Sequence, residues 1–147
     1  MKYMVYISLS TGVRPIELQL MDWDDWDFDR NILTIPKSKS RYWRTIPFNN
    51  SLVDRLRPII KDKGNCFDYA LLPLRKQFLK LLKELSFDFI YYDLRSTYAC
   101  QLLLDGVNLE NVRQLLGHRS LNTTMRYVRA LGNYQKEAIK NFNIFKF

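Results

Sequence analysis

The chain has 147 residues, 47% of them hydrophobic and 14% aromatic, which is enough apolar material for one folded domain and excludes a disordered chain. Its longest apolar runs are too short to cross a bilayer and no signal peptide is evident, so we expect a soluble, cytoplasmic protein with no membrane partner. The 23 Lys and Arg residues outnumber the 15 Asp and Glu residues, and this net charge of +8 favours a polyanionic partner such as nucleic acid.

The first third of the chain predicts two short helices, an acidic turn and a β-hairpin. Residues 2–10 predict a helix that breaks at Gly12, and Pro15 fits the first position of the next helix. A residue before proline avoids helical backbone, so Arg14 should lie at a helix entrance. Segment 22–29 is acidic and predicts a solvated turn. Segments 32–35 and 44–47 favour strands and flank a basic stretch, which predicts a hairpin with a basic tip.

The remainder of the chain predicts helices. Apolar residues recur at helical spacing in segments 52–60, 78–85, 94–103, 109–116 and 124–131. Gly106, Gly117 and Gly132 follow the last three segments, and we expect them to end those helices. Segment 132–147 predicts a C-terminal tail helix. The expected fold is α+β and mainly α, with a small antiparallel sheet, as a single domain over residues 1–147.

Three motifs carry the functional signal. They are TGVRPIEL at 11–18, YDLR at 92–95 and LLGH at 115–118, followed by Tyr127. They place two arginines, the only histidine of the chain and a tyrosine in a fixed order. In this order and spacing the chain resembles the catalytic domain of tyrosine recombinases, the phage integrase family. The resemblance implies a helical catalytic domain that cuts and rejoins DNA.

The resemblance also implies a role for each motif residue. Arg14 and Arg95 would bind the scissile phosphate, because the planar guanidinium donates two parallel hydrogen bonds and stays charged. Either arginine taken alone is better interpreted as a solvated surface charge, and the motif around each one reverses that preference. His118 would hydrogen-bond the same phosphate. Tyr127 would attack it and form a 3′-phosphotyrosyl bond; since a free phenol has a pKa of about 10, this nucleophile needs nearby cations or a base.

The hairpin supplies the expected general acid. In the family, a lysine on the turn, five residues before the arginine of the second strand, protonates the leaving 5′ oxygen; the register set by Arg44 selects Lys39 here. Lys37 would replace it if the hairpin were shifted. A basic tip also reads simply as a contact to the DNA backbone. The expected DNA-binding side chains are Lys37, Arg41, Arg44 and Arg119.

Tyr92 departs from the family pattern, which most often has histidine at this position. A neutral phenol does not readily exchange a proton near pH 7, although it can still hydrogen-bond a phosphate oxygen or the nucleophile. We therefore count Tyr92 among the catalytic residues and expect slower chemistry rather than none. Tyr91 and Tyr92 could alternatively be packing residues.

The predicted function is site-specific recombination of double-stranded DNA, without a metal or a cofactor. The alternative is a recombinase-like module that binds DNA but no longer cuts it. A type IB topoisomerase shares the chemistry, but the short spacing from the LLGH motif to Tyr127 favours a recombinase. The chain begins close to the first arginine motif, so we expect it to lack the upstream core-binding domain of the family. It would then be an isolated catalytic domain, a fragment of a larger gene product or a naturally short relative. Segment 134–147 would dock either on a neighbouring protomer, within a tetramer on DNA by resemblance, or on its own core.

Overall fold

Local backbone chemistry sets the first two helices. In the computed structural model, which describes residues 1–37, 43–67 and 71–140 (backbone alone at 71–75 and 133–140), α1 spans Lys2–Thr11 and α2 spans Pro15–Gln19. Gly12 ends α1 with φ of 62°, and a Cβ atom there would lie 2.4 Å from Cδ1 of Tyr98. Only glycine meets both demands. Arg14 has extended backbone and caps α2, as predicted.

A small antiparallel sheet follows, in the order β1-β2-β3. Strand β1 covers Trp26–Asp27, β2 covers Ile32–Ile35 and β3 covers Arg44–Pro47, so the predicted hairpin is confirmed. Its tip, residues 38–42, lies outside the described residues. Alternate residues of β3 point inward, which buries Arg44 and Ile46 and exposes Thr45 and Pro47.

The acidic segment before the sheet differs from the predicted solvated turn. It forms a short 3₁₀ helix, Trp23–Asp25, followed by β1. Trp23 and Trp26 are buried in the main core; both rings pack near Phe28, and Trp26 also packs near Phe48. Aromatic burial therefore decides the path of this segment, because large rings contribute the most apolar area to a small core.

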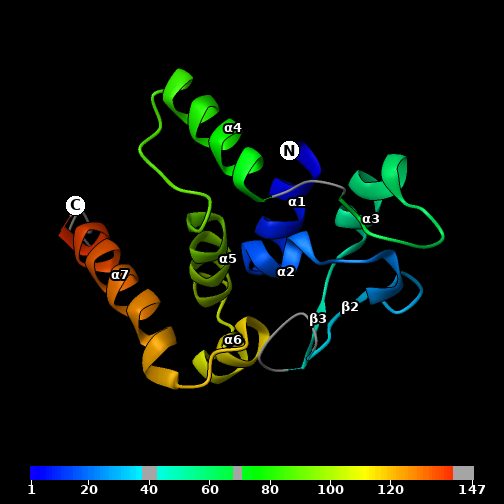
Figure 1. Ribbon diagram of the computed structural model, residues 1–147. Coiled ribbons are helices and arrows are strands. Elements are labelled where there is room, and N and C mark those ends of the chain that lie inside the picture. Colours follow the sequence, from blue (N-terminus) through cyan, green and yellow to red (C-terminus); the bar gives the residue numbers. More distant parts are fainter. Residues whose placement is uncertain (38–42, 68–70, 141–147) are drawn as a thin grey trace.

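The other helices are α3 (Asn50–Leu56), the 3₁₀ turn Arg57–Ile59, α4 (Leu71–Glu84), α5 (Asp93–Leu104), α6 (Leu109–Leu116) and α7 (Leu121–Lys140). A mainly helical domain with a small antiparallel sheet was predicted, and this is confirmed. Helix α5 is central: it packs against α1, α6 and α7, with α1 and α7 on opposite sides of it and α6 near its lower end in Figure 1. Within the described residues, no helix is long and apolar enough to cross a membrane.

Helix α7 is longer than expected. The prediction that it ends at Gly132 is wrong, because one helix continues through this residue to Lys140. Gly132 is not among the glycines with positive φ. A glycine inside a helix destabilises it by only about 1 kcal/mol relative to alanine, so the helix-forming residues on either side are enough to continue the helix. Residues 141–147 lie outside the described residues, so where the tail docks stays a prediction.

Candidate active site

The C-terminal end of α6 organises the site. Its last carbonyl groups have no partner within the helix and carry the negative end of the helix dipole. Four guanidinium groups bind four consecutive carbonyls there: Arg44 Nε binds Leu115 (2.8 Å), Arg95 Nη2 binds Leu116, Arg14 Nη2 binds Gly117 (2.9 Å) and Arg113 Nη1 binds His118 (2.6 Å). Segments far apart in the chain are thereby fixed around the LLGH motif.

Gly117 makes this convergence possible. It caps α6 with φ of 62°, and a Cβ atom there would lie 3.0 Å from the Arg44 side chain. The left-handed backbone turns the chain sharply after the helix, so His118 follows directly beside the bound arginines. The sequence predicted that α6 ends at Gly117, and the structure confirms it.

Among the predicted site residues that the structure describes, Arg95 is the most deeply buried. Its side chain is 1% exposed, and Nη1 donates to the carbonyl of Gly12. Its Nε atom has no hydrogen-bond partner among the described residues. Burial, and then the charge of Arg14, lower the pKa of Arg95 to about 10, so the guanidinium stays charged at neutral pH. Since Arg95 uses only part of its donor set in these contacts, further donors remain for an anion.

Glu17 holds two arginines in place, and sequence reasoning missed it. Its carboxylate accepts from Nη1 of Arg14 at 2.7 Å and from Arg44 at 2.9 and 2.7 Å. Burial by itself raises the pKa of Glu17, but the hydrogen bonds and charges of Arg44 and Arg14 outweigh it and lower the pKa to about 2. The signal was present: Glu17 follows the helix cap Arg14 by three residues, as in a capping box, and accepts its backbone N–H at 2.7 Å.

The structure corrects the prediction for Arg44. We expected a DNA contact, but its side chain is 6% exposed and faces Glu17 and the end of α6. Its place on the inward face of β3 explains this, because residue 44 alternates with the exposed Thr45. Arg44 is therefore a structural residue beneath the site rather than a surface contact.

His118 lies at 6% exposure with its Nδ1 atom 2.9 Å from Oγ1 of the fully buried Thr124. Burial, and then the charges of Arg95 and Arg14, lower the pKa of His118 to about 4. The imidazole is consequently neutral at physiological pH. Its ring also stacks on that of Tyr127, with centroids 6.2 Å apart and planes 16° from parallel.

Tyr127 lies on α7, 4% exposed, and its hydroxyl accepts a hydrogen bond from Nη2 of Arg126 at 2.8 Å. The Arg126 guanidinium carbon is 4.8 Å from the Tyr127 ring centroid and 5.6 Å from that of Tyr92. Arg126 therefore links the predicted nucleophile to Tyr92. Sequence reasoning missed this contact.

The two neighbouring tyrosines have different surroundings. Tyr91 is a packing residue: it is buried, its hydroxyl lies 3.0 Å from Oγ of Ser8, and burial raises its pKa to about 12. Tyr92 is half-buried at the start of α5 and faces Arg126. The structure thus separates the two, and only Tyr92 joins the site.

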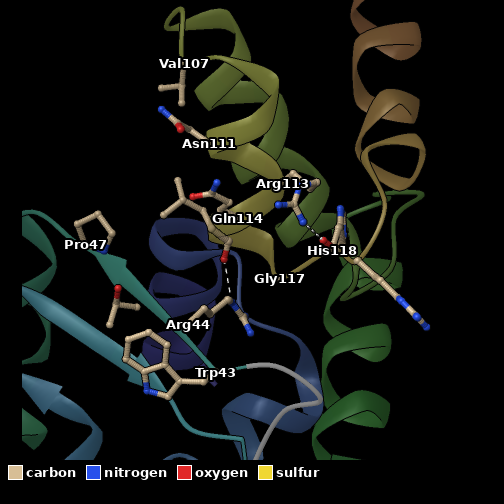
Figure 2. Close-up of a pocket in the computed structure, with 12 residues that line it drawn as sticks. Trp43, Arg44, Pro47, Val107, Asn111, Arg113, Gln114, Gly117 and His118 are labelled. Atoms are coloured by element: carbon tan, nitrogen blue, oxygen red, sulfur yellow. Dashed lines mark hydrogen bonds between the residues drawn. The ribbon is translucent and has the colours of Figure 1, made fainter.

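A cleft of about 660 Å³ opens between β3 and α6, beside His118. Figure 2 shows Trp43 and Arg44 on one wall and Asn111, Gln114 and His118 along the other. Trp43 is 64% exposed at its rim. Of the remaining predicted DNA contacts, Arg119 also lines the cleft and is exposed, and Lys37 is exposed after β2. Lys39 and Arg41 lie outside the described residues.

The arrangement brings Arg14, Arg95 and His118 around one helix end, with Tyr127 stacked on the histidine. The sequence model of the phage integrase family matches residues 1–133. The chain belongs to the phage integrase family. Among the described residues of this family member, no group of three or more His, Cys, Asp or Glu side chains is placed to hold a metal ion.

Known family members resemble this phage integrase domain over most of its length. Tyrosine recombinase XerA of Pyrococcus furiosus is 26% identical over 158 residues, which cover 99% of this chain and 55% of the relative. The chain thus spans about half the length of this relative. A crystal structure of XerA recombinase has a TM-score of 0.73 and 21% identity, covering 92% of this chain and 57% of that one.

Two further solved structures share the fold. The catalytic domain of bacteriophage HP1 integrase has a TM-score of 0.71 at 24% identity, covering 98% of this chain and 83% of that one. XerH recombinase, bound to a palindromic difH substrate in a post-cleavage complex, has a TM-score of 0.70 at 24% identity, covering 95% and 45%. At these identities the likeness establishes a common fold.

Proposed function

We propose that this chain catalyses site-specific DNA recombination, in which a strand is cut and rejoined through a 3′-phosphotyrosyl intermediate. The observation that carries the proposal is the convergence of Arg14, Arg95 and His118 at one helix end, with Tyr127 stacked on the histidine. Two fixed cations, a neutral hydrogen-bonding ring and a phenol form a set suited to attack on a phosphodiester. XerH, which shares the fold, is bound to its DNA substrate.

The two arginines would neutralise the negative charge on the phosphoryl oxygens in the transition state. Their positions are fixed before DNA arrives, by Glu17 and by the carbonyls of α6, so little reorganisation is needed during the reaction. Arg14 is 29% exposed and so meets solvent, whereas Arg95 lies beneath it. We therefore assign the first contact with an incoming phosphate to Arg14.

His118 would donate a hydrogen bond from Nε2 to a phosphate oxygen. A neutral imidazole has one N–H, so Nε2 carries it only when Nδ1 accepts a hydrogen bond. The Thr124 hydroxyl, 2.9 Å from Nδ1, would donate this hydrogen bond and so select the tautomer. The low pKa of His118, about 4, keeps the ring neutral, so it is suited to hydrogen-bonding rather than to adding positive charge.

In the cleavage step the Tyr127 oxygen forms a bond to phosphorus while the bond from phosphorus to the 5′ oxygen breaks. The phenolic proton leaves to water, and the 5′ oxygen takes a proton from the general acid, for which Lys39 remains our prediction. The reverse attack by a 5′ hydroxyl releases Tyr127 and rejoins the strand. Phosphodiester energy is conserved in the covalent bond, so this step calls for no nucleotide cofactor.

Double-stranded DNA would approach across the exposed side of Arg14 and the cleft beside His118. Exposed Trp43 and Arg119 border the cleft, and Lys37 lies near the start of the hairpin tip. Basic and aromatic groups together suit contacts to phosphates and sugars, which position DNA without reading its sequence. Assembly into a homo-oligomer on DNA, through the C-terminal tail, remains part of the proposal.

Covalent trapping tests the proposed function. The 147-residue chain would be incubated with duplexes tiled across the DNA that flanks its gene. Each duplex carries a nick, so that the short product of cleavage diffuses away and the covalent complex accumulates. We expect a protein–DNA band that survives denaturation, disappears with Tyr127→Phe and persists with the control Tyr3→Phe. Bound DNA without any covalent band would contradict the proposal and favour a module that binds DNA without cutting it.

A further inference from the structure

Arg126 is an exposed residue of α7 whose guanidinium lies between two tyrosine rings. It donates to the Tyr127 hydroxyl at 2.8 Å, lies 4.8 Å from the centroid of that ring, and lies 5.6 Å from the Tyr92 ring of α5. Adjacent positions on a helix point in different directions, so this contact requires the arginine side chain to fold back over its neighbour. The Tyr92 ring provides a surface that holds it there.

In the hydrogen bond between Arg126 and Tyr127, the arginine is the donor and the phenol oxygen is the acceptor. A guanidinium only donates hydrogen bonds and has no lone pair with which to take a proton. Arg126 therefore binds a lone pair of the phenol oxygen and leaves the phenolic proton free to depart to water. A charge-assisted bond of this kind strengthens as negative charge grows on the oxygen, which is the change that occurs when the phenol becomes a nucleophile.

We propose that Arg126 is a catalytic residue that stabilises the phenolate form of Tyr127 during attack, with Tyr92 positioning the guanidinium. The inference rests on the proposed function, since it assumes that Tyr127 is the nucleophile. The proposal also gives Tyr92 a role. Tyr92 stands where the family most often has histidine, and a phenol does not readily exchange a proton near neutral pH. In this proposal the positive charge of Arg126 assists the nucleophile, and no proton transfer by residue 92 is needed.

The electrostatics of Arg126 agree with this role. Its hydrogen bond to Tyr127 raises the pKa of Arg126, and the Tyr92 side chain adds to the effect. The guanidinium consequently stays charged throughout the range in which phenols ionise. Arg14 and Arg95, by contrast, hydrogen-bond carbonyls at the end of α6, and their charges act on His118.

A pH–rate profile on a modified DNA separates this role from a structural one. The substrate is a duplex with a bridging 5′ phosphorothiolate at the cleaved position; its sulfur leaves as a thiolate without needing an acid. The rate of covalent-complex formation then reports on ionisation of the nucleophile. The profile would be recorded from about pH 6 to about pH 10, the range that brackets phenol ionisation, at saturating protein.

We expect Arg126→Ala to form the covalent complex about 10- to 100-fold more slowly at neutral pH, the range typical for loss of a hydrogen bond to a charged group. The deficit should shrink as the pH rises, because hydroxide then removes the proton without help. Arg126→Lys should recover part of the rate, since it keeps the charge. The control Arg129→Ala removes an exposed charge one turn further along α7 and should follow the wild-type profile.

Two outcomes would overturn the inference. The first is an Arg126→Ala profile equal to that of the wild type, and the second is a deficit that is the same at every pH, which indicates a structural or DNA-binding role. Failure of the proposed function looks different: the wild type forms no covalent complex, or Tyr127→Phe still forms one. In that case the catalytic role of Arg126 fails with it.

Two further measurements test the geometry itself. In ¹⁵N spectra of the DNA-free protein, the guanidinium signals of Arg126 should change in Tyr127→Phe and not in Tyr3→Phe; unchanged signals would remove the contact on which the inference stands. In the cleavage assay, Tyr92→Phe keeps the aromatic face and should form the covalent complex about 3- to 10-fold faster than Tyr92→Leu at neutral pH. Equal rates for these two variants would contradict the positioning role.

Discussion

The carboxylate of Glu17 and the guanidinium of Arg44 form a two-pronged ion pair inside the protein, with oxygen–nitrogen distances of 2.9 and 2.7 Å. Both side chains are nearly fully buried, at 1% and 6% exposure. The pair joins the first arginine motif to the hairpin, and the same carboxylate holds Arg14. The position of Arg14, which we propose binds the phosphate, therefore depends on a buried residue that no phosphate would touch.

Replacing Glu17 by glutamine should destabilise the fold strongly. The change keeps the size of the side chain but removes the carboxylate that pairs with the buried charge of Arg44, a loss that costs about 3–5 kcal/mol. Urea denaturation at neutral pH measures it. The matched control is Glu84→Gln: Glu84 is 60% exposed and 3.9 Å from Lys80, so the change should stay within about 0.5 kcal/mol. Equal effects for the two variants would contradict the structural role of the pair.

Stability should fall on acidification in two steps. The pKa of His118 is about 4 in the folded state, below its ordinary value, so its contribution is complete above about pH 6.5 and is lost as the pH falls through 4. The pKa of Glu17 is about 2, so its contribution is lost lower, from about pH 4.5 towards 2. Each is worth on the order of 3 kcal/mol.

Urea titrations across this range separate the two groups. His118→Asn should flatten the upper step and leave the lower one, while Glu17→Gln should do the reverse. A His118→Asn variant that loses stability between about pH 6.5 and 4 as steeply as the wild type would show that another group is responsible.

Two glycines should respond in opposite directions to alanine. Gly12→Ala places a Cβ atom 2.4 Å from the Tyr98 ring at a positive φ, so we expect a loss of about 2–4 kcal/mol from strain and overpacking. Gly132→Ala meets nothing within 4 Å and lies inside α7, so it should stabilise the protein by about 0.5–1 kcal/mol. Urea midpoints measure both changes. A destabilised Gly132→Ala would argue against a continuous helix at that position.

Thr124 should control the hydrogen bonding of His118. Thr124→Val keeps the shape but removes the hydroxyl 2.9 Å from Nδ1, so the ring loses the partner that selects its tautomer. We expect covalent cleavage to fall about 10-fold or more, with Thr124→Ser close to the wild type. Thr123→Val, at an exposed position of the same helix, serves as the control. Unchanged cleavage by Thr124→Val would contradict the role assigned to this hydroxyl.

Much of the backbone around the site was predictable from the sequence, because short-range rules determine it. Pro15 starts a helix, Gly12 and Gly117 adopt left-handed backbone, and Arg14 must stay extended before proline; steric limits on one or two residues are enough for each. The helical periodicity likewise located α5 and α6. The motif spacing then indicated which residues to examine for function.

Long-range contacts decided what the sequence left open. Whether Arg44 faces DNA or the core depends on a carboxylate 27 residues away, and the course of segment 22–29 depends on where two tryptophans find apolar partners. Gly132 lies inside α7 because the residues on both sides of it are helical. The sequence by itself determined the backbone turns and indicated which side chains to propose as reactive. Tertiary packing alone decided which arginine binds the buried carboxylate, which bind the end of α6 and which binds the Tyr127 hydroxyl. These pairings depend on distances between segments, and local rules do not constrain such distances.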